Sequence, residues 1–494
     1  MKTRGVSLIG CMLGIVLLAA CNPIAPPIDE GATATTVAPT EPTAPSPPEV
    51  VAPTTTTATT TPPPEVKPTI PETTPSPEVT VPNAAGFVHP GVLVDINQLN
   101  MVRTKIANGE QPWTAAYIKM RDSGGSSATA ARKHYKFSDL NYPPAAVSEV
   151  RCWAGTGMAY AQAHPELNLT ESGCREQTDD AMAAYTQALM WYFTGNEAYA
   201  KKSIEIMNAW SYNLNAIPFD QPRTDKNQQI FGNGILQAAW TGQLMPRAAE
   251  IIRYTYNGWK AADVAKMESM LSNVIYPVIK NGWTGGANGL MSYPEAIMGI
   301  GVFTNNRAVF DSGVAMWRKN VKTIIYMPSD GSQPIAPHAM YAGSNTWSYW
   351  FKPTSYIAGL GGETGRDLSH TLMGFGAMSN GAATGSIQGV DLFGEEQARI
   401  TAAYELHAGW VNQYLDEKAR LGNKEPASSW RPSGWVNPNF VVGGTGYTGG
   451  WEVAYNHYAK KKSVAMPQTA KLINRLRPSS PNMTMIWETA THTR

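Results

Sequence analysis

The sequence predicts an all-α fold in which helical hairpins form an (α/α) toroid, an incomplete barrel, after a disordered stalk rich in proline and threonine. Apolar side chains recur at helical spacing in one segment after another, and short polar turns such as Asn305-Asn306 join these segments. Strand-type alternation is nearly absent until the end of the chain. The segments are not alike in sequence, which argues against a short-repeat solenoid.

The first 21 residues predict an export signal. Lys2 and Arg4 precede an apolar run over residues 6–20, which is too short for an ordinary membrane span. The run ends in Leu18-Ala-Ala-Cys21, which resembles a bacterial lipobox, and the alternative is a secretory signal with a chance cysteine. Because Asn22 follows, we expect a lipid anchor at Cys21 in the cell envelope, at the outer membrane. The remaining chain would lie in the periplasm or at the cell surface, with no other membrane contact.

Residues 22–85 have the composition of a disordered linker. Proline, threonine, valine, alanine and glutamate dominate, and no aromatic residue occurs in this linker; the first beyond it is Phe87. Such a segment cannot bury enough apolar area to offset its ordering entropy. Its prolines favour extended stretches, so we expect a semi-rigid stalk that carries one folded domain over residues 86–494.

The distribution of charge favours an acidic partner. The whole chain carries +1, the leader +2 and the stalk −6, which leaves +5 on residues 86–494. A mildly basic body suits an acidic substrate. Basic residues are scattered rather than clustered, so we expect no nucleic-acid interface.

The cysteines indicate a disulfide rather than a metal site. Cys11 and Cys21 belong to the leader, and an exported protein would pair the remaining Cys152 and Cys174. This bridge would close a loop of roughly twenty residues and contribute about 2–4 kcal/mol. No cysteine pair has metal-ligand spacing and no His-Glu-x-x-His motif occurs, so we expect no metal and no cofactor.

The first helices of the domain can be placed in order. Residues 96–122 predict a helix that Gly109 and Pro112 divide in two, and a short helix lies between the two cysteines. Thr178-Asp-Asp180 predicts the N-cap of a helix that runs to about Phe193. After a turn at 194–196, a partner helix passes through Trp210 and completes a helical hairpin.

The pattern of paired helices joined by short turns continues along the chain. Residues 233–256, interrupted near Pro246, pair with 261–279, and residues 293–304 pair with 307–325. Residues 428–450, rich in glycine, proline and tryptophan, predict a long loop of a kind that often carries function. Residues 451–458 return to helix.

Residues 361–375 form the stretch with the clearest chemistry. A glycine-rich approach leads into a helical pattern in which Arg366 and His370 are four apart and would share one face, beside Asp367. A fixed cation, an imidazole and a carboxylate together could hold an anionic substrate and move a proton. The alternative is a buried Arg366–Asp367 ion pair, with His370 bonded to a carbonyl.

Other candidates suit sugar binding. Trp347 lies in an aromatic loop, and the apolar faces of a pyranose stack on such rings. Asn233 and Gln237 are one turn apart with Trp240 after them and could bond sugar hydroxyls, and His338 lies in a further loop. The alternatives are that large aromatics brace the hairpins from within and that the two amides brace a helix start.

Several segments together resemble the alginate-lyase-type family of helical polysaccharide lyases. The similarity is collinear over about residues 87–460. Its segments are residues 89–94, 179–191, 206–211, 246–253 and 295–303, together with Gly365-Arg-Asp-Leu-Ser-His-Thr371 and Tyr455-Asn-His-Tyr458. The resemblance implies an (α/α) toroid that cleaves an acidic polysaccharide, such as alginate or polyglucuronate, by β-elimination.

The resemblance also implies site residues. Elimination requires that the uronate carboxylate be neutralised, that a base take the C5 proton and that an acid protonate O4. The resemblance assigns Arg366 and His370 to neutralisation and proton handling and Asn288 to the carboxylate, with a simple turn asparagine as the alternative. Tyr447, from its loop, and Tyr455, from the family motif, are the preferred tyrosines, and Tyr293, Tyr404 and Tyr458 are the alternatives. Departures from the family pattern after Asn288 and before Gly365 indicate a different subsite preference.

Two other functions fit the same composition. A glycoside hydrolase on a toroid would need two carboxylates that flank the scissile bond, with Asp179, Glu295 and Asp367 as candidates. A non-catalytic surface lipoprotein would bind glycans through its aromatic loops and cut nothing.

Overall fold

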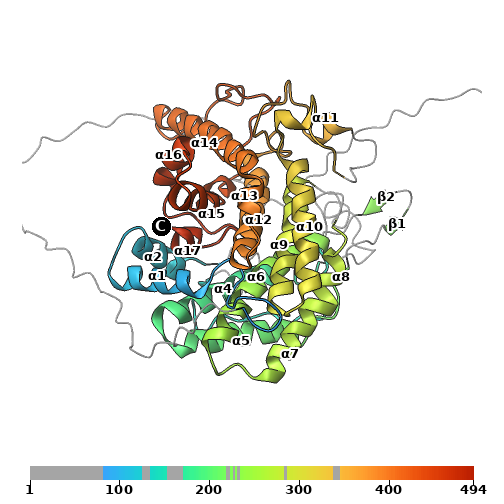
Figure 1. Cartoon of the computed structure of the whole chain (residues 1–494), viewed down its shortest axis with the longest axis vertical. Helices are drawn as coiled ribbons and strands as arrows, with labels where there is room; N and C mark the ends of the chain where they lie inside the picture. The colour runs from blue at the N-terminus through green and yellow to red at the C-terminus, as the bar shows by residue number, and fades with distance from the viewer. Residues whose placement is uncertain are drawn as a thin grey trace, which may run out of the picture.

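The computed structural model describes residues 82–124, 134–152, 171–218, 223–225, 228–230, 234–282, 286–337 and 345–494. Helices dominate these residues (Figure 1). The α-helices are α1 (Ile96–Ala107), α2 (Trp113–Asp122), α4 (Cys174–Thr194), α5 (Glu197–Ser211), α6 (Gly234–Thr255), α7 (Ala261–Met270), α8 (Tyr276–Ile279), α9 (Ala287–Phe303), α10 (Arg307–Ile324), α11 (Thr346–Tyr349), α12 (Leu368–Ile387), α13 (Leu392–Glu395), α14 (Gln397–Arg420), α15 (Glu452–Tyr455), α16 (Pro467–Leu476) and α17 (Glu488–His492).

Shorter elements complete the described chain. Strands β1 (Arg223–Asp225) and β2 (Gln228–Ile230) form an antiparallel hairpin with Thr224 opposite Gln229. A π-helical turn over Leu271–Ile275 joins α7 to α8, and another over Asn456–Lys461 extends α15. In Figure 1 the hairpin lies at the edge of the helical body.

The helices close into a ring. On its inner wall α4 packs on α6, α6 on α9 and α9 on α12. From α12 the contacts pass to α15, α17 and α1, and α1 returns to α4. Outside this wall α5 packs on α4 and α10 on α9, as Figure 1 shows for the latter pair. The predicted (α/α) toroid is therefore confirmed.

Burial separates the inner helices from the outer ones. Every residue of α9 is buried, whereas α10 buries one face that includes Phe310 and Trp317. The two helices approach so closely that a Cβ on Gly301 would stand 2.4 Å from the backbone nitrogen of Phe310. An apolar sequence all round therefore predicts an inner helix, and an amphipathic one predicts the outer layer.

The inner helices point the same way. Thr178 near the start of α4 donates a hydrogen bond to Gln237 near the start of α6, over 3.4 Å. A Cβ on Gly289 in α9 would meet the side chain of Leu236 at 3.3 Å, and one on Gly374 in α12 would stand 3.3 Å from the Cα of Asn288. The N-termini of α4, α6, α9 and α12 therefore gather at one end of the ring. Their dipoles give that end a partial positive charge.

Some predicted boundaries are correct and others are wrong. The division of residues 96–122 is confirmed, because α1 ends at Ala107 and α2 starts at Trp113. The cap predicted at Thr178-Asp-Asp180 is wrong, because α4 begins at Cys174 after Gly173, whose φ is +67°. Asp180 is instead a buried acceptor for the Tyr142 hydroxyl and the Trp210 indole N–H.

The interruption predicted at Pro246 is also wrong. Proline in a helix interior costs about 3 kcal/mol, yet α6 continues through Pro246 from Gly234 to Thr255. Its burial between α4 and α9 outweighs that local cost. Helix α9 begins at Ala287, earlier than the predicted residue 293, so Asn288 belongs to its first turn.

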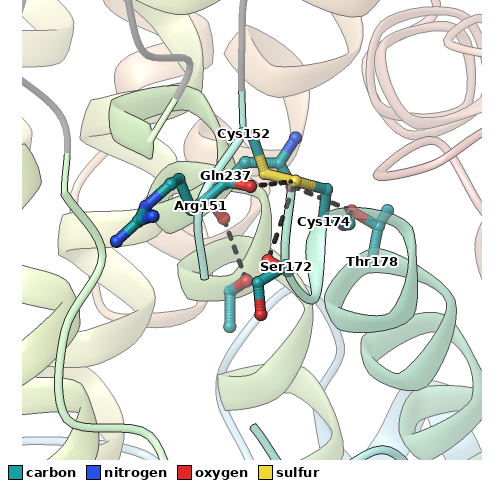
Figure 2. Close-up of a disulfide and its surroundings, with 7 residues drawn as sticks. Arg151, Cys152, Ser172, Cys174, Thr178 and Gln237 are labelled. Carbon is teal, nitrogen blue, oxygen red and sulfur yellow. Dashed lines mark hydrogen bonds between the residues drawn. A yellow bond between two sulfur atoms is a disulfide. The ribbon is translucent and has the colours of Figure 1, made fainter. Parts of the chain in front are cut away.

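Cys152 and Cys174 are joined by a disulfide, with their Cα atoms 5.6 Å apart (Figure 2). The bridge ties the segment before α4 to the first residue of that helix. Beside it, Arg151 and Ser172 exchange backbone hydrogen bonds of 2.8 and 2.9 Å. The predicted leader, Cys21, most of the stalk and the short helix between the cysteines lie outside the described residues. Within the described ranges, no helix has the length and apolarity needed to cross a bilayer.

Candidate active site

A buried glutamate holds the candidate site together. Glu363 is 2% exposed, and its Oε2 accepts hydrogen bonds from the backbone N of Asn288 at 2.8 Å and from the Asn288 side-chain amide at 2.7 Å. Its Oε1 accepts from Nη1 of Arg366 at 2.9 Å. One carboxylate therefore fixes the amide and the guanidinium that were predicted to neutralise a uronate. It also leaves the second side-chain N–H and the Oδ1 of Asn288 for other partners.

Arg366 and His370 do not share a helical face, so that prediction is wrong. Helix α12 begins at Leu368, and Arg366 lies in the turn before it, where Glu363 and the nearby Asp367 hold it. The turn ends at Asp367, which is the N-cap and accepts from the backbone N of His370 at 2.8 Å. Arg366 and His370 therefore lie near each other because both contact the N-cap residue Asp367, and not because they are one helical turn apart.

Asp367 also orients the imidazole. Its Oδ2 lies 2.6 Å from Nδ1 of His370. Burial raises the pKa of Asp367, but the hydrogen bond and charge of His370 outweigh burial and hold the pKa below its ordinary value. Because an ionised carboxylate only accepts, Nδ1 carries the proton and Nε2 is the nitrogen that can take one up. Of the alternative reading, the Arg366–Asp367 ion pair is present, over 3.8 Å, but His370 is bonded to Asp367 rather than to a carbonyl.

The loop before α15 is fixed against the start of α12. The backbone N–H groups of Leu368 and Ser369 donate to the carbonyls of Val441 and Val442, at 2.9 and 3.2 Å. Gly443 has a φ of +74°, and a Cβ there would stand 2.6 Å from Oδ1 of Asp367. Because the first N–H groups of α12 are paired in this way, this helix end offers no free N–H for a ligand.

This loop brings the residue before one candidate tyrosine, Tyr447, against the start of α12, while the Tyr447 ring packs on Tyr414 of α14 with the centroids 5.9 Å apart. A Cβ on Gly446 would meet the Ser369 hydroxyl at 2.3 Å, so Tyr447, in a short 3-10 turn (Gly446–Thr448), follows a residue in contact with α12. Burial raises the pKa of Tyr447 and keeps its hydroxyl protonated. Tyr455, by contrast, lies between Val453 and Asn456, which line a pocket with Ser386 at the far end of α12.

Of the predicted sugar-binding residues that the structure describes, two are buried and one is exposed. Gln237 and Trp240 are both buried in α6, and Gln237 is bonded to Thr178 (Figure 2). Trp347 is 48% exposed on α11. That segment leads to Phe351, whose Cβ would lie 2.7 Å from one built on Gly365. Trp347 is therefore exposed near the site, whereas Asn233 and His338 lie outside the described residues.

Two of the three carboxylates proposed for a hydrolase, Glu295 and Asp367, are committed to other bonds, and Asp179 is buried in α4. Glu295 is buried in an ion pair with Arg247 and also accepts from the Gln243 amide. Asp367 holds His370, as described above. Burial, opposed by Arg247, raises the pKa of Glu295. A pair of carboxylates on either side of a scissile bond is therefore not formed by these two residues.

Two supporting residues were missed from the sequence. Glu363 stood in the Gly362-Glu-Thr segment, which departs from the family pattern, and it lies 75 positions from its partner Asn288. His407 in α14 is fully buried, and its Nε2 lies 2.7 Å from the Thr364 hydroxyl, which in turn accepts from the backbone N of Gly361. No local spacing signals either contact. No group of three His, Cys, Asp or Glu side chains in the described ranges is arranged to hold a metal ion.

A family model described as alginate lyase matches residues 114–417. The chain belongs to the alginate lyase family. It is accordingly a polysaccharide lyase, and the resemblance in the sequence is confirmed. No curated protein sequence matches the chain.

Solved alginate lyases resemble the chain in fold. Alginate lyase A1-III from Sphingomonas species A1 is 12% identical, covers 84% of this chain and 97% of its own, and gives a TM-score of 0.49. A histidine-to-alanine variant of alginate lyase A1-III complexed with a tetrasaccharide is 13% identical over 82% and 95% of the two chains, with a TM-score of 0.48. Because both TM-scores are below 0.5, the family assignment rests on the family model.

Proposed function

We propose that this alginate lyase family member cleaves a uronate-containing acidic polysaccharide, alginate or a polyglucuronate, by β-elimination. The observation that carries the proposal is the joined set of Asn288, Glu363, Arg366, Asp367 and His370 at the end where the inner helices start. The dipoles of those helices add a positive potential at that end, of which Glu363 and Asp367 take up a part at the starts of α9 and α12. The chemistry of elimination assigns a task to each member of the set.

Asn288 and Arg366 face the carboxylate of the uronate and disperse the charge that develops on it as C5 loses its proton. Nε2 of His370 takes the C5 proton, and Asp367 stabilises the imidazolium that results. The C4–O4 bond breaks as the double bond between C4 and C5 forms. Tyr447, which stays protonated, supplies the proton to the departing O4.

For sugar binding, the proposal names fewer residues than the sequence did. Trp347 is the exposed aromatic residue beside the site, and we assign it to stacking on a neighbouring sugar ring. Gln237 and Trp240 are buried in the first turns of α6, so they support the wall of the site rather than its surface.

A test of the reaction uses the full chain with alginate, polyglucuronate and hyaluronan in parallel. We expect a rise in the ultraviolet absorbance of an unsaturated uronate on at least one polymer, together with new reducing ends. New reducing ends without that absorbance would indicate hydrolysis. Binding to a polymer without any cleavage would leave a glycan-binding protein.

The location of the enzyme is a separate proposal. The leader and the cysteine at position 21 favour export and lipidation, with the stalk over residues 22–85 holding the lyase domain away from the outer membrane. Replacing Cys21 with serine should release the protein from the membrane fraction after cell lysis. An unchanged distribution would refute the anchor.

A further inference from the structure

A pocket of about 130 Å³ lies at the end of the ring opposite the candidate active site. Ala383, Ser386 and Ile387 contribute the last turns of α12. The rest of the lining comes from the extended α15, the start of α1, α13 and the last described residues. His370 and Ser386 are separated by about 24 Å along α12, at 1.5 Å per residue. The pocket is therefore separate from the catalytic group.

Two cations, Lys461 and Arg494, line this pocket, and Asp95 is the one acid among its lining residues. Among the described residues, the side chains of Lys461 and Arg494 form no ion pair and no hydrogen bond, with protein carboxylates or with the carbonyls at the end of α12. Asp95 also lines the pocket, but its carboxylate is the N-cap of α1 and accepts from the backbone N of Gln98 at 2.7 Å. The acid is thus partly committed to the helix.

The cations are close enough to repel one another. Lys461 and Arg494 are both exposed as residues, but partial burial of the Lys461 ammonium lowers its pKa, and the charge of Arg494 lowers it further, against an opposing effect of Asp95. Burial likewise lowers the pKa of Arg494, against an opposing effect of Asp95. Two positive charges in one partly buried pocket, with Asp95 as the single acid in its lining, favour the binding of a further anion.

His457 gives the pocket a neutral, flat wall. Its ring stacks on Phe393 with the centroids 4.0 Å apart. Burial, and then the charge of Lys461, lowers the pKa of His457 to about 4, so the imidazole is neutral at pH 7. His492 lies deeper, and its nitrogens are engaged by the Thr491 hydroxyl and the carbonyl of Leu93.

We propose that this pocket binds a small oxyanion, either the carboxylate of a uronate residue or a phosphate, between Lys461 and Arg494 with His457 beside it. The volume is below the roughly 300–1,000 Å³ of sites for larger ligands, so it suits one anionic group or the end of a sugar chain. Polar side chains of Ser386, Gln98 and Asn456 line the same space. A uronate held here would give the enzyme a second point of attachment to an acidic polysaccharide. The site does not depend on whether the chain cleaves that polymer.

The experiment follows His457 as a local reporter. The full chain is titrated with pH by NMR in the presence of inorganic phosphate, of glucuronate, or of sodium chloride at the same ionic strength, with the His457 signal assigned through His457→Gln. A bound anion should raise the pKa of His457 by about one unit or more, because it offsets the neighbouring cations. Chloride should not do so.

Two lysine variants decide the result. Lys461→Gln should abolish the shift caused by the anion and weaken binding by about tenfold or more. Lys460→Gln is the matched control, since it removes the same charge from the adjacent residue, which lies over the Tyr455 ring and does not line the pocket. A shift with glucuronate alone would assign the site to a sugar carboxylate, and a shift with phosphate alone would assign it to a phosphate. No shift with either anion, or an equal shift in Lys461→Gln, would overturn the proposal.

Discussion

Replacing Glu363 with glutamine tests whether a single buried carboxylate positions the catalytic amide and guanidinium. The substitution keeps the size of the side chain but converts one of its oxygens into an amide. Since Oε2 serves Asn288 and Oε1 serves Arg366, either orientation of the new amide presents N–H groups to one of the two donors. One side of the network must therefore break.

The magnitude follows from the bonds that are lost. A hydrogen bond to a charged group contributes about 1.5–3 kcal/mol, so Glu363→Gln should lower the free energy of unfolding by about 2–3 kcal/mol. A displacement of about 1 Å at Asn288 or Arg366 costs roughly a hundredfold in rate. We therefore expect kcat/KM on the preferred polyuronate to fall about a hundredfold, with most of the loss in kcat.

The assay pairs steady-state lyase rates with urea unfolding. Glu250→Gln is a control of the same burial, in which one oxygen, Oε2, accepts from the backbone N of Gly91 and lies 2.9 Å from Nδ1 of His89, so a glutamine oxygen can serve both donors. The control should keep the wild-type activity. If Glu363→Gln loses stability but keeps the wild-type kcat/KM, the positioning role of Glu363 is refuted.

Three further predictions concern the same end of the ring. His370→Ala should abolish elimination while the melting temperature stays nearly unchanged; a large drop in melting temperature would instead indicate a structural role for the imidazole. Gly443→Ala should lower kcat, because its Cβ would stand 2.6 Å from Oδ1 of Asp367 and its φ of +74° disfavours alanine. A kcat equal to that of the wild type would show that the loop can move away without disturbing Asp367. Burial lowers the pKa of His407 to about 4, so the unfolded chain binds more protons between about pH 6.5 and pH 4, and stability falls as pH falls. This single group contributes a slope of up to about 1.4 kcal/mol per pH unit, which His407→Gln should remove from urea unfolding curves; identical slopes would contradict it.

The sequence located the helices better than their ends. Apolar periodicity is a local property, so α1, α5 and α10 could be predicted from it, along with the break between α1 and α2. The start of α4 and the continuity of α6 through Pro246 were predicted wrongly. Burial against neighbouring helices outweighed a good cap sequence in one case and a helix breaker in the other.

The candidate site was also predicted only in part, because its residues come from distant parts of the chain. Asn288, Arg366 and His370 could be named from motifs, because each motif is contiguous in the chain. Their arrangement could not, since Arg366 precedes α12 and Glu363, far from Asn288 in sequence, joins the two. The choice of Tyr447 over Tyr455 likewise depends on the loop fixed against the first turn of α12.

The sequence by itself determined an all-α domain of the lyase type and predicted the residues that we propose to neutralise a uronate and move a proton. Helical periodicity and contiguous motifs are encoded within a few turns of chain, so they can be read without a fold. The tertiary structure alone decided that the inner helices start at one end, that Glu363 joins Asn288 to Arg366, and that Lys461 and Arg494 share a distant pocket. Those features depend on contacts between residues far apart in sequence, and only the closed ring of helices sets which of them meet.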